Sequence, residues 1–317
     1  MSSSALKTIS SCKYLSLVWD DMYKKTPKAK RDFSAGIDAL SVTYIENNKQ
    51  EIFKDISDRI RSGTYKFSPL KPHFLPKPDG KERLICVPTV QDRLVQRALL
   101  KYLSGQRKYC MRNKVSFGFL PGSKVSETLI HAQHKRQSLS WVYKADISSF
   151  FDEIDRSILK EKIKRRIRLS SLHDLLCSVV DTEVYIANNN IKKRIKKLGI
   201  RNGKGIRQGM PLSPYFSNIF LEKFDLTIQE KEIRMIRYAD DFLIFTDSEQ
   251  RCRDHHSMCE NLLSKIGLAI HPLTSGTKTT ISSPNEAVEF LGLNIEKKGG
   301  DNYEIVLSGA QITYIKK

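Results

Sequence analysis

The sequence lacks the features that carry a chain into or across a membrane. Nowhere in its 317 residues is there an apolar window of about 18 residues, the length that a transmembrane helix needs. The serine-rich N-terminus also lacks the apolar core of a signal peptide. These absences predict a cytoplasmic protein with no membrane partner.

The six cysteines include no C-x-x-C pair, which argues against a disulfide framework and predicts reduced thiols. Two of them share a helical stripe with two histidines, in the order Cys252, His255, His256 and Cys259. This spacing would suit zinc. Apolar residues continue the same stripe, however, and unligated cysteine is among the most buried residue types. We therefore predict core packing.

Acidic residues are too few to balance the basic ones. The chain has 54 Lys and Arg against 35 Asp and Glu, a net charge of +19. This excess is larger than solubility requires and predicts a polyanionic partner. The basic run Lys24–Arg31 lies in a polar segment, and we expect residues 1–35 to form a partly ordered N-terminal arm. Its charges could contact nucleic acid or simply be solvated.

One stretch, IRMIRYADDFLIFT, places an acidic pair between two apolar, β-prone runs. The pattern predicts a tight hairpin of two buried strands with Asp240 and Asp241 at its tip. Aspartate is a favoured turn residue, which explains the pair without any function. Alternatively, two like charges at the floor of a cleft would require a cation. The pair alone leaves both explanations open.

A third carboxylate, Asp146, ends the β-prone run that starts at Trp141. If this strand lies beside the hairpin, the three carboxylates converge. Hard oxygen ligands suit Mg²⁺, with Mn²⁺ as an alternative, and two such ions would support nucleotidyl transfer. Asp152 and Asp155 compete for the role, but Asp155 is better placed to cap the following helix.

Residues 63–89 read as a two-stranded finger with a turn at Pro78-Asp79-Gly80. The finger would project Lys77 and Arg83, which could lie over a triphosphate. Without further clues, an exposed basic hairpin explains it equally well. Thr89 is predicted to cap the helix that follows, and Asp92, three residues later, makes this start resemble a capping box.

Two more segments carry positive charge or histidine. His131 and His134 lie on a polar helix with no third metal ligand nearby, which favours a surface or backbone-positioning role over metal binding. The segment from Lys192 to Arg207 is densely cationic, and we predict a hairpin over a template there.

The motifs together resemble a known family. YADD, the strand-borne Asp146, RQGMPLSP, PKPDGKER and FLGLNI occur in the order seen in reverse transcriptases, over about residues 36–295. The similarity is to bacterial enzymes of the group II intron type, a set that includes retron and defence-associated enzymes. It implies an α/β right-hand polymerase with fingers, an antiparallel palm sheet and a thumb that is short or missing. The implied domains are fingers at 36–140, palm at 141–300 and the start of a truncated or minimal thumb at 301–317.

The resemblance also implies residue roles. Asp146, Asp240 and Asp241 would bind the metal ions and form the catalytic set. The residues that would contact the incoming deoxynucleotide are Lys77, Arg83, Phe151, Gln208 and Lys278. Phe151 would exclude a ribose 2′-hydroxyl, and Lys278 would act at the pyrophosphate. The primer grip would be Phe290, Leu291 and Gly292.

The implied activity is RNA-directed DNA synthesis from a dedicated, structured non-coding RNA, in antiviral defence against phage. The VTG tripeptide and N-A-x-x-H element of retron enzymes are not found. A retron-like or intron-derived enzyme without a defence role, or an RNA-directed RNA polymerase, are the alternatives. Expected partners are the RNA template, deoxynucleotides and the DNA product, with a protein partner or second copy in place of the thumb.

Overall fold

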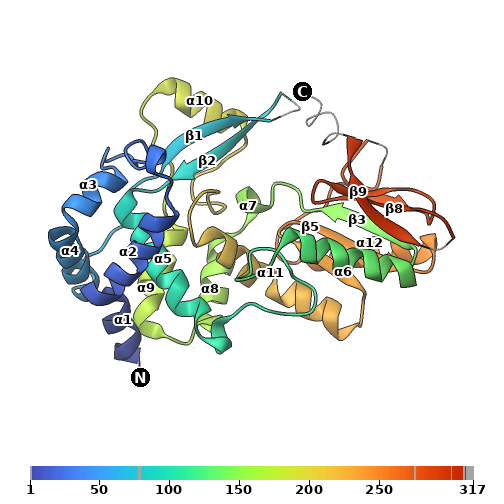
Figure 1. The fold of residues 1–317 in the computed structure, drawn as a ribbon, viewed down its shortest axis with the longest axis horizontal. Coiled ribbons are helices and arrows are strands. Elements are labelled where there is room, and N and C mark those ends of the chain that lie inside the picture. Colours follow the sequence, from blue (N-terminus) through green and yellow to red (C-terminus); the bar gives the residue numbers. More distant parts are fainter. Residues whose placement is uncertain (1, 78–79, 275, 301, 310, 312–317) are drawn as a thin grey trace. The chain divides into compact units, whose positions relative to one another are not determined.

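The computed structural model describes residues 2–77, 80–274, 276–300, 302–309 and 311. Contacts divide the chain into two compact units, shown as a ribbon in Figure 1. Unit 1 comprises residues 1–110 and 151–220, and unit 2 comprises residues 111–150 and 221–317. Among the described helices, none is both long enough and apolar enough to cross a membrane. The domain boundaries expected above stay predictions.

Unit 1 is mainly helical. Its elements are α1 (Ser2–Ser10), α2 (Cys12–Lys25), η1 (Lys28–Lys30), α3 (Val42–Asn47), α4 (Lys49–Arg61), β1 (Lys71–Pro76), β2 (Glu82–Val87), α5 (Val90–Ser104), η2 (Arg107–Tyr109), α8 (Arg156–Arg166), η3 (Ser170–Leu172), α9 (His173–Val180) and α10 (Asn189–Lys197). The predicted finger is confirmed as the antiparallel pair β1 and β2. The predicted caps are confirmed too, because Thr89 accepts the Asp92 amide and Asp155 accepts the Ile158 amide.

The N-terminal segment is helical, unlike the partly ordered arm we expected. Ile9, Leu15 and Trp19 are fully buried on α1 and α2. The apolar residues are sparse and separated by lysine and serine, so their helical spacing is easily missed. Burial of these side chains on one face supplies the stability that composition alone does not indicate.

The prediction of a hairpin at Lys192–Arg207 is wrong, because this segment begins in helix α10. The Asn188 side chain accepts the Ile191 amide at 3.0 Å and so caps the helix. Arg194 lies 3.8 Å over the Phe74 ring. Helix α10 is therefore held against the finger of unit 1.

Unit 2 contains two antiparallel sheets. Its elements are α6 (Val125–Ser138), β3 (Trp141–Asp146), β4 (Met235–Tyr238), β5 (Asp241–Thr246), α12 (Glu249–Ser264), β6 (Thr280–Ser282), β7 (Val288–Phe290), β8 (Leu293–Lys297) and β9 (Tyr303–Leu307). The first sheet has the order β4-β5-β3-β6 and the second has the order β7-β8-β9. Helices α7 (Phe150–Glu153) and α11 (Ser213–Glu230) run from one unit into the other. The predicted antiparallel palm sheet is confirmed.

The first sheet of unit 2 is apolar on both faces because each is covered. Val142 is paired with Phe245, and both pack with α6 and the second sheet in one core. On the other face, Tyr143 is paired with Ile244 and its hydroxyl lies 2.9 Å from His256 Nδ1 on α12. Alternating side chains along each strand therefore serve two different cores.

The cysteines of α12 lie in the second of these cores. Cys252 and Cys259 are both fully buried. Burial raises the pKa of the Cys259 thiol far above its ordinary value. The prediction of core packing for this stripe is confirmed for both cysteines.

Candidate active site in unit 2

Two of the three predicted carboxylates face each other at the end of the first sheet. Strands β3 and β5 pair in a register that sets Asp146 directly opposite Asp241. Directly opposed residues of an antiparallel pair project to the same face. Lys144, two residues before Asp146, shares that face. The structure thus brings two acids and one lysine together from segments nearly 100 residues apart.

The acidic pair occupies a two-residue turn, as predicted. Tyr238 pairs with Asp241, so that Ala239 and Asp240 make the connection between β4 and β5. Ala239 has a φ of 61°, in the left-handed region that favours glycine. A β-carbon on Gly118 would lie 2.5 Å from the Ala239 nitrogen, so a neighbouring loop packs directly onto this turn. The loop that carries Gly118 therefore restrains the backbone of the turn.

Asp240 does not join the other two carboxylates in a single ligand group. Asp240 belongs to the two-residue turn, whereas Asp241 is the first residue of β5. Within the part of the chain that the structure describes, no three His, Cys, Asp or Glu side chains are placed to share one ion. The Asp240 carbonyl instead accepts the Ile147 amide at 3.1 Å. That bond ties the turn to the end of β3.

The environment of Asp241 suits a bound cation. Its Oδ1 atom is buried and has no hydrogen-bond partner among the described residues. Burial raises the pKa of Asp241 to about 7; Lys144 lowers it, and the neighbouring Asp146 and Asp240 raise it again. A buried carboxylate oxygen without a donor is costly unless a cation approaches it. The donor set is all carboxylate oxygen, which fits Mg²⁺.

Lys278 lies at the same site. Its Nζ atom is 2.9 Å from Asp146 Oδ2, and His271 Nε2 is 3.6 Å from Asp146 Oδ1. The Lys278 side chain is 66% exposed, which leaves it free to turn toward an incoming anion. The structure therefore places this residue beside the predicted catalytic acids.

The predicted primer grip is the turn between β7 and β8. Phe290 pairs with Leu293, which leaves Leu291 and Gly292 as the two turn residues. Their φ values are 52° and 83°, the pattern of a type I′ turn. Lys144 Nζ donates to the Glu289 carbonyl at 2.7 Å. The same lysine that faces Asp241 thus links the acid-bearing strand to this hairpin.

The buried Arg237 secures the acidic turn. Its Nε and Nη2 atoms donate to both carboxylate oxygens of Asp225 on α11, at 2.7 and 2.5 Å. Its Nη1 atom donates to the Ala239 carbonyl at 2.7 Å. Asn113 Nδ2 also donates to Asp225 Oδ2, at 3.1 Å. One guanidinium therefore joins helix α11 to the turn that carries the acids.

The predicted nucleotide-contacting residues other than Lys278 belong to unit 1. Gln208 accepts the Cys86 amide on β2 at 2.7 Å, and Phe151 accepts the Ile206 amide at 2.8 Å, in both cases through the backbone carbonyl. A β-carbon on Gly209 would come within 2.3 Å of the Cys86 carbonyl, so only glycine fits there. The segment 206–209 thus connects the base of the finger to Phe151.

Lys77 and Arg83 lie on the finger itself. Lys77 follows β1, and its amide donates to the Lys81 carbonyl at 2.7 Å. Arg83 is on β2 opposite Leu75. The predicted turn residues Pro78 and Asp79 lie outside the described residues. Burial raises the pKa of Asp152, which follows Phe151, and Arg207 and Lys77 oppose this shift. Lys77 therefore acts electrostatically on the segment that carries Phe151.

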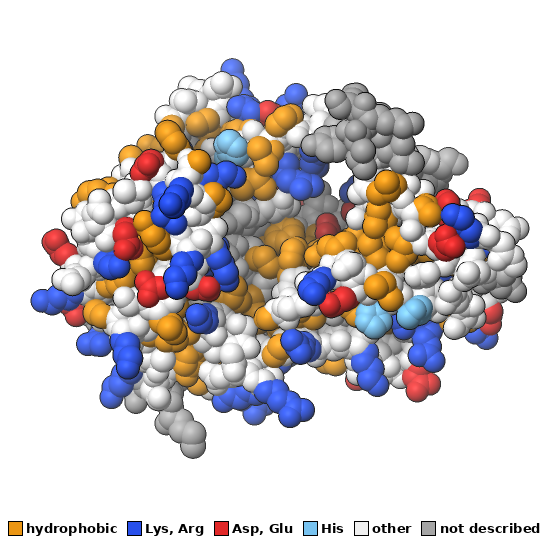
Figure 2. Space-filling model, in the orientation of Figure 1, with side chains coloured by type: hydrophobic (Ala, Val, Ile, Leu, Met, Phe, Trp, Pro, Cys, Tyr) orange, Lys and Arg blue, Asp and Glu red, His pale blue; other side chains and the backbone are white. Residues whose placement is uncertain are grey.

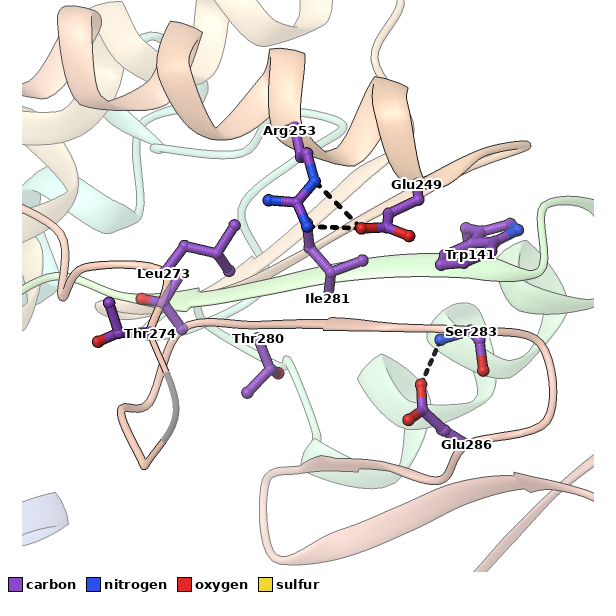
Figure 3. A pocket seen from close by; sticks show the side chains of 10 residues that line it. Trp141, Glu249, Arg253, Leu273, Thr274, Thr280, Ile281, Ser283 and Glu286 are labelled. Carbon is purple, nitrogen blue, oxygen red and sulfur yellow. Dashed lines mark hydrogen bonds and ion pairs between the residues drawn. The ribbon is translucent and has the colours of Figure 1, made fainter.

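A separate cavity of about 440 Å³ lies along the edge strand β6. Figure 3 shows Arg253 turned toward Glu249 beside it, and their closest atoms are 2.6 Å apart. None of the predicted site residues lines this cavity. Its one basic side chain, Arg253, is already paired with Glu249, so we assign the cavity no role in the chemistry.

The model of one protein family, described as "Reverse transcriptase (RNA-dependent DNA polymerase)", matches residues 75–295. The chain belongs to the reverse transcriptase family. The match includes every residue assigned above to metal, nucleotide or primer-grip contacts.

Two curated proteins are similar to the chain over part of their length. The chain is 26% identical over 216 residues to Protein YkfC of Escherichia coli (strain K12), covering 65% of this chain and 53% of YkfC. It is 23% identical over 233 residues to the Group II intron-encoded protein LtrA of Lactococcus lactis subsp. cremoris, covering 73% and 36% of the two chains. The chain thus spans about half of the first relative and about a third of the second.

A solved structure shows the same fold at low sequence identity. Telomerase from Candida albicans, in complex with a fragment of telomeric RNA, superposes with a TM-score of 0.53 at 12% identity, over 85% of this chain and 50% of that one. Together with the antiparallel sheets, this similarity confirms the right-hand polymerase fold of a reverse transcriptase.

Sequence reasoning missed Arg237, the residue before the YADD motif. Its signal was present: a single charge in the middle of an otherwise apolar strand must be paired when buried. The partner, Asp225, lies on another element and could not be chosen from the sequence. Phe151, at 8% exposure, is more enclosed than a gate residue at an open surface would be.

Proposed function

We propose that this reverse transcriptase family member is an RNA-directed DNA polymerase that extends a primer by two-metal nucleotidyl transfer. The observation that carries the proposal is the pairing of Asp146 with Asp241 across β3 and β5, with a buried carboxylate oxygen that lacks a donor. This arrangement lies inside the family match. A buried carboxylate oxygen of Asp241 that has no hydrogen-bond donor, opposite a second carboxylate, has little structural use, but it suits a cation site.

Asp146 and Asp241 would hold Mg²⁺, with Asp240 as the third carboxylate and Mn²⁺ as the alternative ion. When bound, two such ions would activate the primer hydroxyl and neutralise the leaving pyrophosphate. Lys278 then has a defined use, since its ammonium already lies 2.9 Å from Asp146. It would release this carboxylate to the ion and pair with the pyrophosphate. Positioning and charge neutralisation are what such a transfer demands of the protein.

The residues of unit 1 would select the nucleotide. Lys77 and Arg83 supply positive charge on the finger for the triphosphate. Phe151 and Gln208 are joined through segment 206–209, so the gate ring and the nucleotide-contacting amide would be positioned as one piece. We assign fingers to residues 36–140 and palm to residues 141–300.

The template we propose is a dedicated, structured non-coding RNA, and the cDNA would serve in antiviral defence against phage in the cytoplasm. The net charge of +19 supports a polyanionic partner. The defence role rests on the resemblance to defence-associated reverse transcriptases.

Primer extension on an RNA template with deoxynucleotides tests the polymerase assignment. Asp241→Asn should abolish extension while RNA affinity stays within about twofold, because the charge is needed at the reacting phosphate. Asp254→Asn, which removes an exposed carboxylate from α12 of the same unit, should extend like the parent protein. Retained synthesis by Asp241→Asn would refute the metal assignment.

The template proposal is tested by purifying the protein from its native host with its bound nucleic acid. Sequencing should find one abundant structured RNA together with complementary DNA. Heterogeneous RNA without complementary DNA would rule out a dedicated template. Loss of phage protection in an Asp241→Asn strain would support the defence role, and unchanged plaque counts would contradict it.

A further inference from the structure

A cleft on unit 2 is lined by cationic and neutral side chains only. Its volume is about 550 Å³, and its lining residues are His131, His134, Lys135, Ser138, Leu139 and Arg234. Figure 2 shows histidine side chains in pale blue beside Lys and Arg side chains in blue on the face over α6. The two histidines, for which the sequence predicted a surface or backbone-positioning role, thus share a cleft with Lys135 and Arg234.

The charges in this cleft are not neutralised within the protein. Among the described residues, the Lys135 ammonium and the Arg234 guanidinium have no acidic partner. Burial lowers the pKa of Lys135, and Arg234 lowers it further. Holding the Arg234 guanidinium beside the half-buried Lys135 ammonium is costly unless an anion joins them. This repulsion between Lys135 and Arg234 favours an anionic ligand in the cleft.

The neighbouring cation shows the contrast. Arg136 is fully buried and its Nη2 atom donates to the carbonyls of Ser283 and Glu286, at 3.2 and 2.5 Å. Its guanidinium also lies 4.5 Å from the centre of the Tyr303 ring. Arg136 therefore serves the fold of unit 2, whereas Lys135, one residue earlier, faces the cleft and serves no internal partner.

The cleft is separate from the acidic site. Arg234 immediately precedes β4, and the turn with Asp240 follows the other end of that strand. At roughly 3.3 Å per residue, the six intervening steps place Arg234 up to about 20 Å from the turn. Helix α6 packs on β4 and β5 and fixes the cleft relative to the sheet.

We propose that this cleft is a second nucleic-acid site of unit 2, which binds backbone phosphates of an RNA strand away from the reacting end. Each of its polar side-chain groups can donate a hydrogen bond: the ammonium, the guanidinium, the imidazoles and the Ser138 hydroxyl. It offers neither a carboxylate to accept from a base or ribose nor a phenyl, phenol or indole ring on which a base could stack. Such a lining recognises phosphate and is indifferent to sequence.

The first test is lysine footprinting of the wild-type protein, which does not depend on DNA synthesis. An amine-acetylating reagent would be applied with and without a stem-loop RNA, and modification at Lys135 would be read by mass spectrometry. We expect the RNA to protect Lys135 several-fold, while inorganic phosphate at the same concentration of phosphate groups gives no protection. Equal labelling with and without RNA would overturn the proposal, and protection by inorganic phosphate alone would replace RNA by a free phosphate.

The second test measures the salt dependence of RNA affinity in variants that lose the same charge. Lys135→Gln/Arg234→Gln should bind the stem-loop about tenfold more weakly, and its slope of log affinity against log salt should fall by about 1 to 2. The control is Arg251→Gln/Lys298→Gln, which removes two exposed cations of unit 2 that already pair with Asp247 and Glu304. An equal loss of slope in both double variants would show only a general charge effect and would overturn the site.

Discussion

Arg237 and Asp225 form a two-pronged ion pair with no access to solvent, at 0% and 1% side-chain exposure. The third donor of the same guanidinium holds the carbonyl of Ala239, in the turn that carries the catalytic candidates. Planar guanidinium and carboxylate groups match in geometry, and the pair loses most of its value if either partner is removed. Arg237 is thus a positioning residue for the acidic turn.

Arg237→Met should destabilise the fold strongly, because it leaves the Asp225 charge buried without a partner. We expect a loss of about 3 to 5 kcal/mol in the free energy of unfolding, measured by urea denaturation. Arg251→Met breaks the exposed pair with Asp247 and should cost less than about 1 kcal/mol. Similar losses in the two variants would show that the buried pair contributes no more to the free energy of unfolding than the exposed pair.

The stability of the metal-free protein should fall as the pH rises through 7. The pKa of Asp241 is about 7 in the fold and 3.8 for an unperturbed aspartate. The folded state therefore binds the additional proton between these values, and the stability that this proton provides is lost as pH rises. The change amounts to at most about 4 kcal/mol.

Thermal unfolding in EDTA from pH 4.5 to 8 would measure this loss, with Asp241→Asn as the comparison. The asparagine variant should show a flatter profile and be more stable than the parent near neutral pH. Added Mg²⁺ should stabilise the parent protein and have little effect on the variant. A parent profile as flat as that of the variant would contradict the burial of this charge.

The buried thiols should resist alkylation. Burial raises the pKa of Cys86 to about 12, so almost none of it is thiolate at pH 8, and the thiolate is the reactive form. Cys252 and Cys259 are fully buried, whereas Cys12 is exposed. Iodoacetamide at pH 8 should therefore label Cys12 first, and guanidinium should make all six sites react. Rapid labelling of Cys259 in the native protein would contradict the packing of α12.

Phe151→Ala should admit ribonucleotides. If the ring excludes the ribose 2′-hydroxyl, its removal should reduce the preference for deoxynucleotides at least about tenfold, since a steric cost of only about 1.4 kcal/mol corresponds to a factor of ten. Phe151→Tyr keeps a ring of similar size and should keep the preference. The test is the ratio of kcat/KM for deoxynucleotides to kcat/KM for ribonucleotides, measured for each variant. An unchanged ratio in Phe151→Ala would remove the gate role.

The sequence by itself determined the local features. Apolar runs on either side of Tyr238-Ala239-Asp240-Asp241 encode the hairpin, because alternate side chains must be buried on both faces. The caps at Thr89 and Asp155 follow from hydrogen bonds between near neighbours. The excess of positive charge is a matter of composition and needs no fold. Motif order alone carried the resemblance to reverse transcriptases.

Only the tertiary structure decided which distant side chains meet. Register, which depends on pairing across the whole sheet, set Asp146 opposite Asp241, whereas Asp240 lies in the turn and joins no three-residue ligand group among the described residues. The pairing of Arg237 with Asp225 and the meeting of Lys135 with Arg234 each join segments separated by other elements. Such contacts depend on how helices and strands pack against one another in three dimensions, which local sequence patterns do not specify.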